Sequence, residues 1–323
     1  MSDPLDALAL VRAVHLLATV LVSGAVFFRV FVAEPALGCA SATLPGRMRA
    51  RLRDLLAINL AVATISGAAW LGLLAARIGD TSFLDAFGET AWTLLTQTQF
   101  GTVWQLRFAL AFVLAAGLWR STAGATPIRN IIAIAASACF VGTLAWSGHG
   151  AATPGTAGDL HLLADILHLI AAAAWLGGLL PLVMLMRWMI RSTEKIDPVS
   201  FSGVLHRFSN LGLIAVATLV VTGALNTYFI LGDADALFAG DYGRVLLAKL
   251  TLFAVMLAFA AVNRLKLTPD LASAQADPAR EARLIRRIRL NAAAEAGLGI
   301  AIVVLVGRLG IIAPSMASQL HLH

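Results

Sequence analysis

The sequence predicts an all-α polytopic membrane protein with eight transmembrane helices in two similar four-helix halves. Three observations indicate this fold class: few charged residues, eight long apolar segments, and an apolar pattern that recurs in the second half. Only 13% of the 323 residues are charged and 59% are hydrophobic, whereas a soluble domain carries about 25% charged residues. The composition therefore places the chain in a lipid bilayer.

Each of the eight apolar segments is long enough to cross a hydrocarbon core, which takes about 20 helical residues. The connections are too short to hold a folded domain, so we expect one integral membrane domain. The start, MSDPLDALAL, lacks the basic region and cleavage site of a signal peptide, so we expect the first helix to be retained. The predicted spans are 8–33, 54–77, 101–119, 128–147, 160–188, 208–231, 243–264 and 289–312.

Basic residues in the connections predict the orientation. The even-numbered connections, 78–99, 148–160 and 231–243, contain no Lys or Arg. Because basic loops stay cytoplasmic, we expect both termini in the periplasm. The same loops account for the net charge of +6, so we do not expect this charge to indicate a nucleic-acid partner. The odd-numbered connections carry Arg47, Arg49, Arg51, Arg53, Arg120, Arg129, Arg191, Lys195, Arg207, Lys266, Arg280, Arg283, Arg286, Arg287 and Arg289.

An internal repeat divides the chain into halves 1–147 and 148–323. HLLATVLVSGAVF begins at His15 and HLIAAAAWLGGLL at His168, and each has a glycine nine residues after its histidine. AVATISGA recurs as AVATLVVTGA, and FGTVWQLR recurs as YGRVLLAK, which pairs Arg107 with Lys249. Four helices per half is an even number, so an axis along the membrane normal should relate the halves and bring both histidines to one depth.

The stretch from Trp146 to Gly178 holds the strongest candidate site. His161, Asp165 and His168 are spaced i, i+4 and i+7, so they share one helical face. Ionisable groups at membrane depth are costly and indicate function. His15, His149, His161, His168 and Asp165 are therefore candidate metal ligands, since imidazole suits copper, zinc and haem iron.

Several alternatives stay open at this point. A membrane histidine also bonds a neighbouring helix in many structural contacts. His149 with His161, and His15 with His168, are more plausible pairs for one ion than His161 with His168. Asp165 is a ligand, a partner orienting an imidazole, or the counter-charge to a basic residue: Arg12, Arg107, Lys249 or Arg308.

Buried groups on other helices have two readings each. Glu295 either couples transport to protons or forms a hydrogen bond with Asn291 or Asn263. A methionine cluster either forms an exit site for Cu(I) or fills space in the apolar core. The cluster comprises Met184, Met186 and Met189.

Several segments together resemble the copper resistance D family of bacterial inner-membrane proteins. They are SGHGAA at 147–152, LHLIAAAAWLGGLL at 167–180, RFSNLGLIAVATLVVTGALN at 207–226 and YGRVLLAKLTLFAVMLAFAAVNRLKLTP at 242–269. The resemblance implies eight helices, copper uptake from periplasm to cytoplasm, and a small periplasmic copper-binding partner (CopC-like). Carried over by position, it implies His149, His161, His168 and His15 as copper ligands.

A second likeness supplies the alternative function. The pattern of His168, Trp175, Gly177 and Gly178 is similar to that of the small haem-binding protoporphyrinogen oxidase family. It implies haem b with His15 and His168 as axial ligands and with Arg107 and Lys249 on its propionates. No nucleotide-binding or hydrolytic motif occurs in a usable context, so the sequence does not support ATP-driven pumping by this chain alone. We expect a transporter rather than an enzyme.

Overall fold

The computed structural model describes residues 4–38, 46–86, 88–119, 126–148, 155–191, 198–232, 235–238, 240–274 and 277–312. These residues form a helical bundle without strands, and eight helical stretches are long and apolar enough to span a membrane, as predicted. Ala7–Leu37, Met48–Gly79, Gln99–Leu118 and Pro127–Ser147 are followed by Gly155–Arg191, Ser200–Leu231, Gly240–Ala272 and Pro278–Leu309.

Four of the eight spans combine several helical elements. The first consists of α1 (Pro4–Phe27), η1 (Phe28–Ala33) and α2 (Glu34–Gly38); α3 (Gly46–Gly79) and α6 (Gln99–Trp119) follow, and the fourth joins α7 (Pro127–Gly142) to η2 (Thr143–Ser147). The fifth comprises α8 (Gly155–Ala172), η4 (Ala173–Gly177) and α9 (Gly178–Arg191), and the sixth is α10 (Pro198–Leu231). The seventh comprises α11 (Gly240–Val262), η6 (Asn263–Leu267) and α12 (Thr268–Ala272), and the eighth is α13 (Pro278–Leu309).

Three of these spans contain a π-helical turn, and a proline follows each turn. The turns are η1, η4 and η6, and the prolines are Pro35, Pro181 and Pro269. A proline has no N–H, and its ring clashes with the carbonyl four residues earlier. In all three cases that carbonyl lies within the π-helical turn, so the wider turn accommodates the proline without ending the helix.

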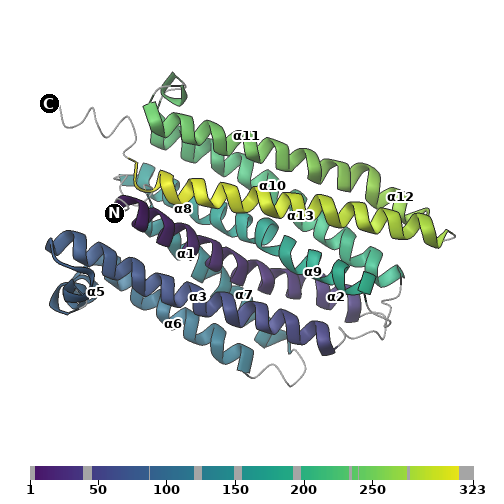
Figure 1. Ribbon diagram of the computed structural model, residues 1–323, viewed down its shortest axis with the longest axis horizontal. Coiled ribbons are helices and arrows are strands. Elements are labelled where there is room, and N and C mark those ends of the chain that lie inside the picture. Colours follow the sequence, from purple (N-terminus) through teal and green to yellow (C-terminus); the bar gives the residue numbers. More distant parts are fainter. Residues whose placement is uncertain are drawn as a thin grey trace.

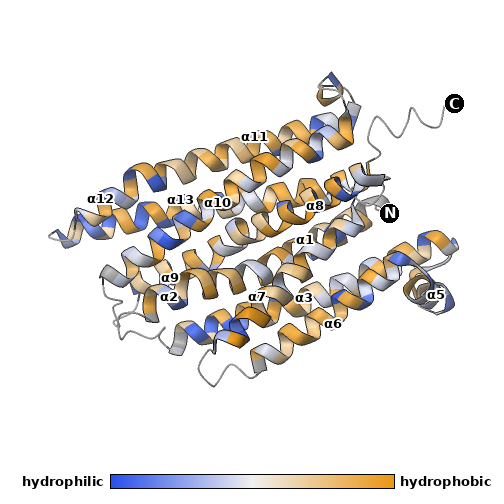
Figure 2. Ribbon diagram, turned by 180° about the vertical axis from the view of Figure 1, so that it is seen from behind, coloured by the Kyte–Doolittle hydropathy of each residue, from blue (hydrophilic) through white to orange (hydrophobic). Residues whose placement is uncertain are grey.

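The first and fifth spans form the centre of the bundle. α1 packs against α3, α7, α13 and η4, whereas α11 lies at the periphery against α13. In Figure 1 the start of α1 and the end of α13 lie at the same end of the bundle, as eight crossings require. Figure 2 shows hydrophobic residues along most of each helix and hydrophilic ones concentrated toward the ends, including the start of α13.

Where α1 crosses η4, the two backbones are in direct contact, with no side chain between them. A Cβ added to Gly24 would overlap the Cα of Gly177 and the carbonyl of Ala173, and one added to Gly177 would overlap the carbonyl of Val20. Only glycine permits this separation of the two helices. These are the two glycines that follow His15 and His168 by nine residues.

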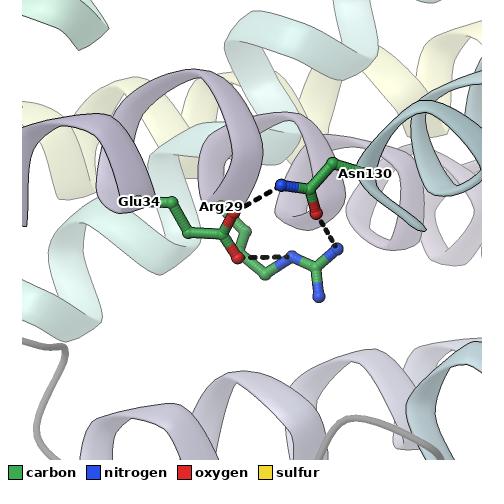
Figure 3. Close-up of polar contacts among 3 residues, drawn as sticks. All are labelled: Arg29, Glu34 and Asn130. Atoms are coloured by element: carbon green, nitrogen blue, oxygen red, sulfur yellow. Dashed lines mark hydrogen bonds and ion pairs between the residues drawn. The ribbon is translucent and has the colours of Figure 1, made fainter. Parts of the chain in front are cut away.

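Two features of the connections were not predicted. The connection 78–99, of which the sequence predicted only that it holds no folded domain, contains two short helices, α4 (Phe83–Ala86) and α5 (Glu89–Gln97). At the other end of the bundle, a polar triangle ties the end of the first span to α7 (Figure 3). Asn130 donates to Glu34 (2.8 Å), Arg29 lies 3.5 Å from Glu34, and Arg29 donates to Asn130 (3.5 Å).

Candidate functional site

α8 carries the predicted face of ionisable residues. His161 is buried, with 2% of its surface exposed, and its ring stacks on Phe229 of α10 with 5.0 Å between ring centres. Asp165 and His168 follow on the same face and are half-buried. The helix therefore presents all three side chains toward α10, which packs along α8.

Hydrogen bonds determine which nitrogen of His168 carries the proton. The hydroxyl of Thr222 donates its proton to the carbonyl of Thr218 at 2.6 Å. Nδ1 of His168 lies 3.0 Å from that hydroxyl oxygen and must therefore donate to it. The lone pair is then on Nε2, which makes no hydrogen bond to any described residue. An imidazole of this kind is prepared to bind a metal ion, with Thr222 as the group that orients it.

Asp165 lies among polar groups from three other segments. Asn226 of α10 donates to its Oδ1 at 3.3 Å, and the backbone of Gly148 lies beside its Oδ2. Lys249 of α11 exerts its charge on both Asp165 and His168 without forming a direct ion pair. Of the four basic residues that the sequence offered as counter-charge to Asp165, the structure brings Lys249 near it.

His15 has a different environment. Its Nδ1 donates to the carbonyl of Ala63 (2.9 Å) and lies 3.2 Å from the hydroxyl of Ser66, while its Nε2 accepts a hydrogen bond from Arg107 (2.6 Å). Trp70 and Trp104 pack against the ring, at 5.6 Å and 5.1 Å between centres. Both ring nitrogens are therefore engaged, and no lone pair is left for a metal ion in this arrangement.

Arg107, which holds His15, is itself 1% exposed. Its guanidinium also donates to the carbonyl of Phe140 (2.8 Å) and to the hydroxyls of Thr143 (2.8 Å) and Thr19 (3.2 Å). No carboxylate in the described part of the chain pairs with it. Neutral oxygens and aromatic faces stabilise the charge instead, since the rings of Phe140 and Trp104 lie against the guanidinium.

The predicted ligands are not gathered into one cluster. No hydrogen bond or ring contact joins His15 to His168, because the first bonds α3 and α6 and the second bonds α10. Among the described residues, no group of three or more His, Cys, Asp or Glu side chains is placed to hold a metal ion. His149 lies outside the described residues. Among the described residues, His168 and Asp165 are therefore neighbouring candidate metal ligands, and His161 lies two turns away on α8.

The structure also describes the surroundings of Glu295 and of the methionine cluster. Glu295 is buried and accepts a hydrogen bond from Asn263 (2.9 Å), which in turn accepts one from Asn291 (3.0 Å). Met186 is fully buried in the apolar core, and Met184 and Met189 pack against that core, which favours the space-filling reading.

Sequence reasoning missed the hydroxyls that hold the two histidines. Ser66 and Thr222 occupy the same position in the repeated motifs SGA and TGA. Ser66 contacts Nδ1 of His15, and Thr222 contacts Nδ1 of His168. A glycine follows each hydroxyl, and Cε1 of the histidine lies against it. The repeat itself was the signal that pointed to these residues.

Comparison with known proteins now adds to the geometry. Residues 1–159 match the N-terminal domain of copper resistance protein D-like proteins, and residues 202–309 match copper resistance protein D. Copper resistance protein D of Pseudomonas syringae pv. tomato is 30% identical over 86% of this chain and 87% of its own length. The inner membrane protein YebZ of Escherichia coli is 32% identical over 64% of this chain and 68% of its own length.

Copper transport protein CutJ of Bacillus subtilis is 36% identical over 37% of this chain and 21% of its own length. No solved structure matches the chain significantly. The haem alternative gains no support, because none of these names mentions haem and Arg107 occupies Nε2 of His15.

Proposed function

Because the chain belongs to the copper resistance protein D family, we propose that it moves copper ions from the periplasm to the cytoplasm through a site formed by His168 and Asp165. Its eight spanning helices and its similarity to an inner membrane protein support a multi-pass protein of the bacterial inner membrane. The names of two relatives support a role connected with copper.

The observation that carries this proposal is the unshared lone pair on Nε2 of His168. Thr222 fixes that tautomer, and Asp165 lies one helical turn away on the same face. A neutral imidazole and a carboxylate are both ligands that copper accepts. When the site is empty, the charge of Lys249 balances that of Asp165.

His161 and His149 form the outer part of the proposed entry path. His161 is two turns before His168 on α8, and His149 directly follows Gly148, whose backbone lies beside Asp165. With both termini in the periplasm, these residues face that compartment, and a small copper-binding partner (CopC-like) delivers the ion to them. His15, held by Arg107, takes part only after that hydrogen bond is broken.

Copper binding and uptake test the proposal directly. We expect His168→Ala and Asp165→Asn in the purified full chain to lose copper from the site and to abolish uptake into proteoliposomes. His206→Ala is the matched control, because His206 is exposed on α10. Unchanged copper content and uptake in both site variants would rule out this site.

A further inference from the structure

Glu295 is a buried carboxyl for which the proposed copper site has no use. It lies on α13 within the span Pro278–Leu309, and 2% of its surface is exposed. Among the described acidic side chains, it alone is buried to this degree. Ionisable groups inside a membrane span are costly and mark ion or proton pathways.

Two hydrogen-bond donors hold this carboxyl, and both come from π-helical turns. Asn263 of η6 donates its Nδ2 proton to Oε1 at 2.9 Å, and the indole of Trp175 of η4 bonds the same side chain. Asn291, one turn before Glu295 on α13, donates to Asn263 at 3.0 Å and fixes the direction of its amide. π-Helical turns of this kind are frequent at functional sites.

Glu295 has no basic partner among the residues that the structure describes, because no Lys, Arg or His side chain there forms an ion pair with it. Arg264, which follows Asn263, donates instead to Ser209 and Asn210 of α10. An ionised carboxylate without a counter-charge is strongly disfavoured in a membrane interior, so the carboxyl is neutral until a cation comes near.

Trp175 links Glu295 to the copper site. It follows His168 by seven residues on the same helical face, which corresponds to about 10 Å along the helix. The face that begins with His161 and His168 thus continues inward to the indole that bonds Glu295.

We propose that Glu295, which is held by Trp175 and Asn263, is the proton-exchange residue of this transporter. This inference depends on the copper transport proposed above. As the copper charge passes inward, the O–H bond of the carboxyl breaks, the electron pair stays on the carboxylate, and the proton leaves to the periplasmic side. Once copper has left, the carboxylate takes up a proton from the cytoplasmic side, which restores the neutral acid. One carboxyl compensates one positive charge at a time, so proton and copper alternate. Asn263 and Asn291 act as positioning residues.

Proteoliposomes containing the full chain and a pH-sensitive dye in the lumen test the exchange. With copper added outside, we expect the lumen of wild-type vesicles to become more alkaline during uptake. Glu295→Gln preserves the hydrogen-bond acceptor but cannot ionise, so the pH change should be lost while copper binding at His168 is retained. Glu281→Gln, near the start of α13, is the matched control. A pH change of wild-type size in Glu295→Gln, or acidification of the wild-type lumen, would overturn the proposal.

Infrared spectroscopy provides a test that requires neither copper transport nor a folded Glu295 variant. The metal-free wild-type protein should show the C=O stretching band of a protonated carboxyl at a frequency that differs from that of carboxylic acids in water. Asn263→Leu should shift this band, because it removes the hydrogen bond that Asn263 donates to Glu295. If the band is absent from wild type, Glu295 carries no proton, whatever copper does. If the band is present but wild type neither binds nor transports copper, the transport proposal fails instead.

Discussion

A threonine hydroxyl decides the chemistry of His168, because it places the proton on Nδ1 and leaves Nε2 for a ligand. At His15 the carbonyl of Ala63 accepts the Nδ1 proton, with the hydroxyl of Ser66 beside it, and the lone pair on Nε2 accepts a hydrogen bond from Arg107. Two side chains in equivalent positions of the repeat thus differ in what they can bind. The difference lies in the nearest basic residue. The guanidinium of Arg107 bonds His15, whereas the ammonium of Lys249 acts on His168 through its charge without a hydrogen bond.

Replacing the orienting hydroxyl should weaken copper binding without removing a ligand. Thr222→Val keeps the shape of the side chain but leaves Nδ1 of His168 without its acceptor. Loss of such an orienting partner costs about 10- to 100-fold in metal affinity. Copper titration of the purified protein measures this effect. The control is Thr227→Val on the same helix, because the hydroxyl of Thr227 donates only to the carbonyl of Gly223. This variant should leave the copper affinity within about twofold of wild type.

Arg107 should be important for stability as well. Arg107→Met removes the hydrogen bonds to His15, Phe140, Thr143 and Thr19 and leaves Nε2 of His15 unpaired. We expect the free energy of unfolding in detergent to fall by about 3 kcal/mol, as is typical when a buried charged network is broken. Arg244→Met, at an exposed ion pair with Asp241, should change it by less than about 1 kcal/mol. Equal effects in the two variants would contradict the network.

The sequence predicted the residues of the site better than their partners. Spacing alone placed His161, Asp165 and His168 on one face, because helical geometry determines that relation. It could not show that Lys249, rather than Arg12 or Arg308, approaches Asp165, because that depends on how separate helices pack. The pairing of His15 with His168 on one ion was suggested by symmetry, but Arg107 already bonds the ring of His15. The role of these residues in copper binding stays a prediction.

At the scale of elements, the bundle depends on helices that bend and touch without breaking. Each π-helical turn accommodates a proline that would otherwise end the span, and η4 and η6 use the wider turn to aim Trp175 and Asn263 at Glu295. The apolar pattern predicted all eight spans but not these turns. A π-helical turn shifts the hydrogen bonds of a few residues and leaves the hydropathy of the segment unchanged.

The contact of α1 with η4 should tolerate no side chain. Gly177→Ala places a methyl group on the carbonyl of Val20 and the Cα of Gly24, so the helices must separate. We expect it to lower the free energy of unfolding by about 1–3 kcal/mol, the usual cost of overpacking. Gly297→Ala on α13 meets no atom within 4 Å and should be neutral or slightly stabilising. Thermal unfolding in detergent compares the two, and a harmless Gly177→Ala would show that the crossing is loose.

The start of α13 should depend on pH through Asp277, which lies outside the membrane span. Its carboxylate accepts hydrogen bonds from the backbone N–H groups of Arg280 and Ala279, both at 3.0 Å, and these bonds lower its pKa. The stabilisation is therefore present above the ordinary pKa of an aspartate and is lost as the pH falls toward the lowered value. Hydrogen exchange in the first turn of α13 should accelerate in acid. Asp277→Asn preserves the cap and should remove this acceleration.

For the whole molecule, the charge of the connections predicts an orientation that the bundle geometry leaves open. The even number of crossings puts the start of α1 and the end of α13 on one side (Figure 1), but which side follows only from the positive-inside rule. The division into halves 1–147 and 148–323 is likewise a prediction. Gly24 and Gly177, which occupy corresponding positions in the repeated motifs, contact each other across that division.

Reporter fusions test the orientation. Alkaline phosphatase fused after the end of the chain should be active and green fluorescent protein there should be dark, because phosphatase folds in the periplasm. Fusions in the basic connection after the first span, near Arg49, should give the opposite result. A fluorescent C-terminal fusion would invert the topology and place His161 and His168 on the cytoplasmic side.

The crossing of α1 over η4 has one more consequence. Two rods that touch without intervening side chains can pivot about the point of contact, yet neither can slide lengthwise without driving a Cα into a neighbouring residue. Gly24 and Gly177 thus fix the closest approach of the first and fifth spans. In the transporter proposed above, a pivot at this crossing would let one end of the bundle open as the other narrows.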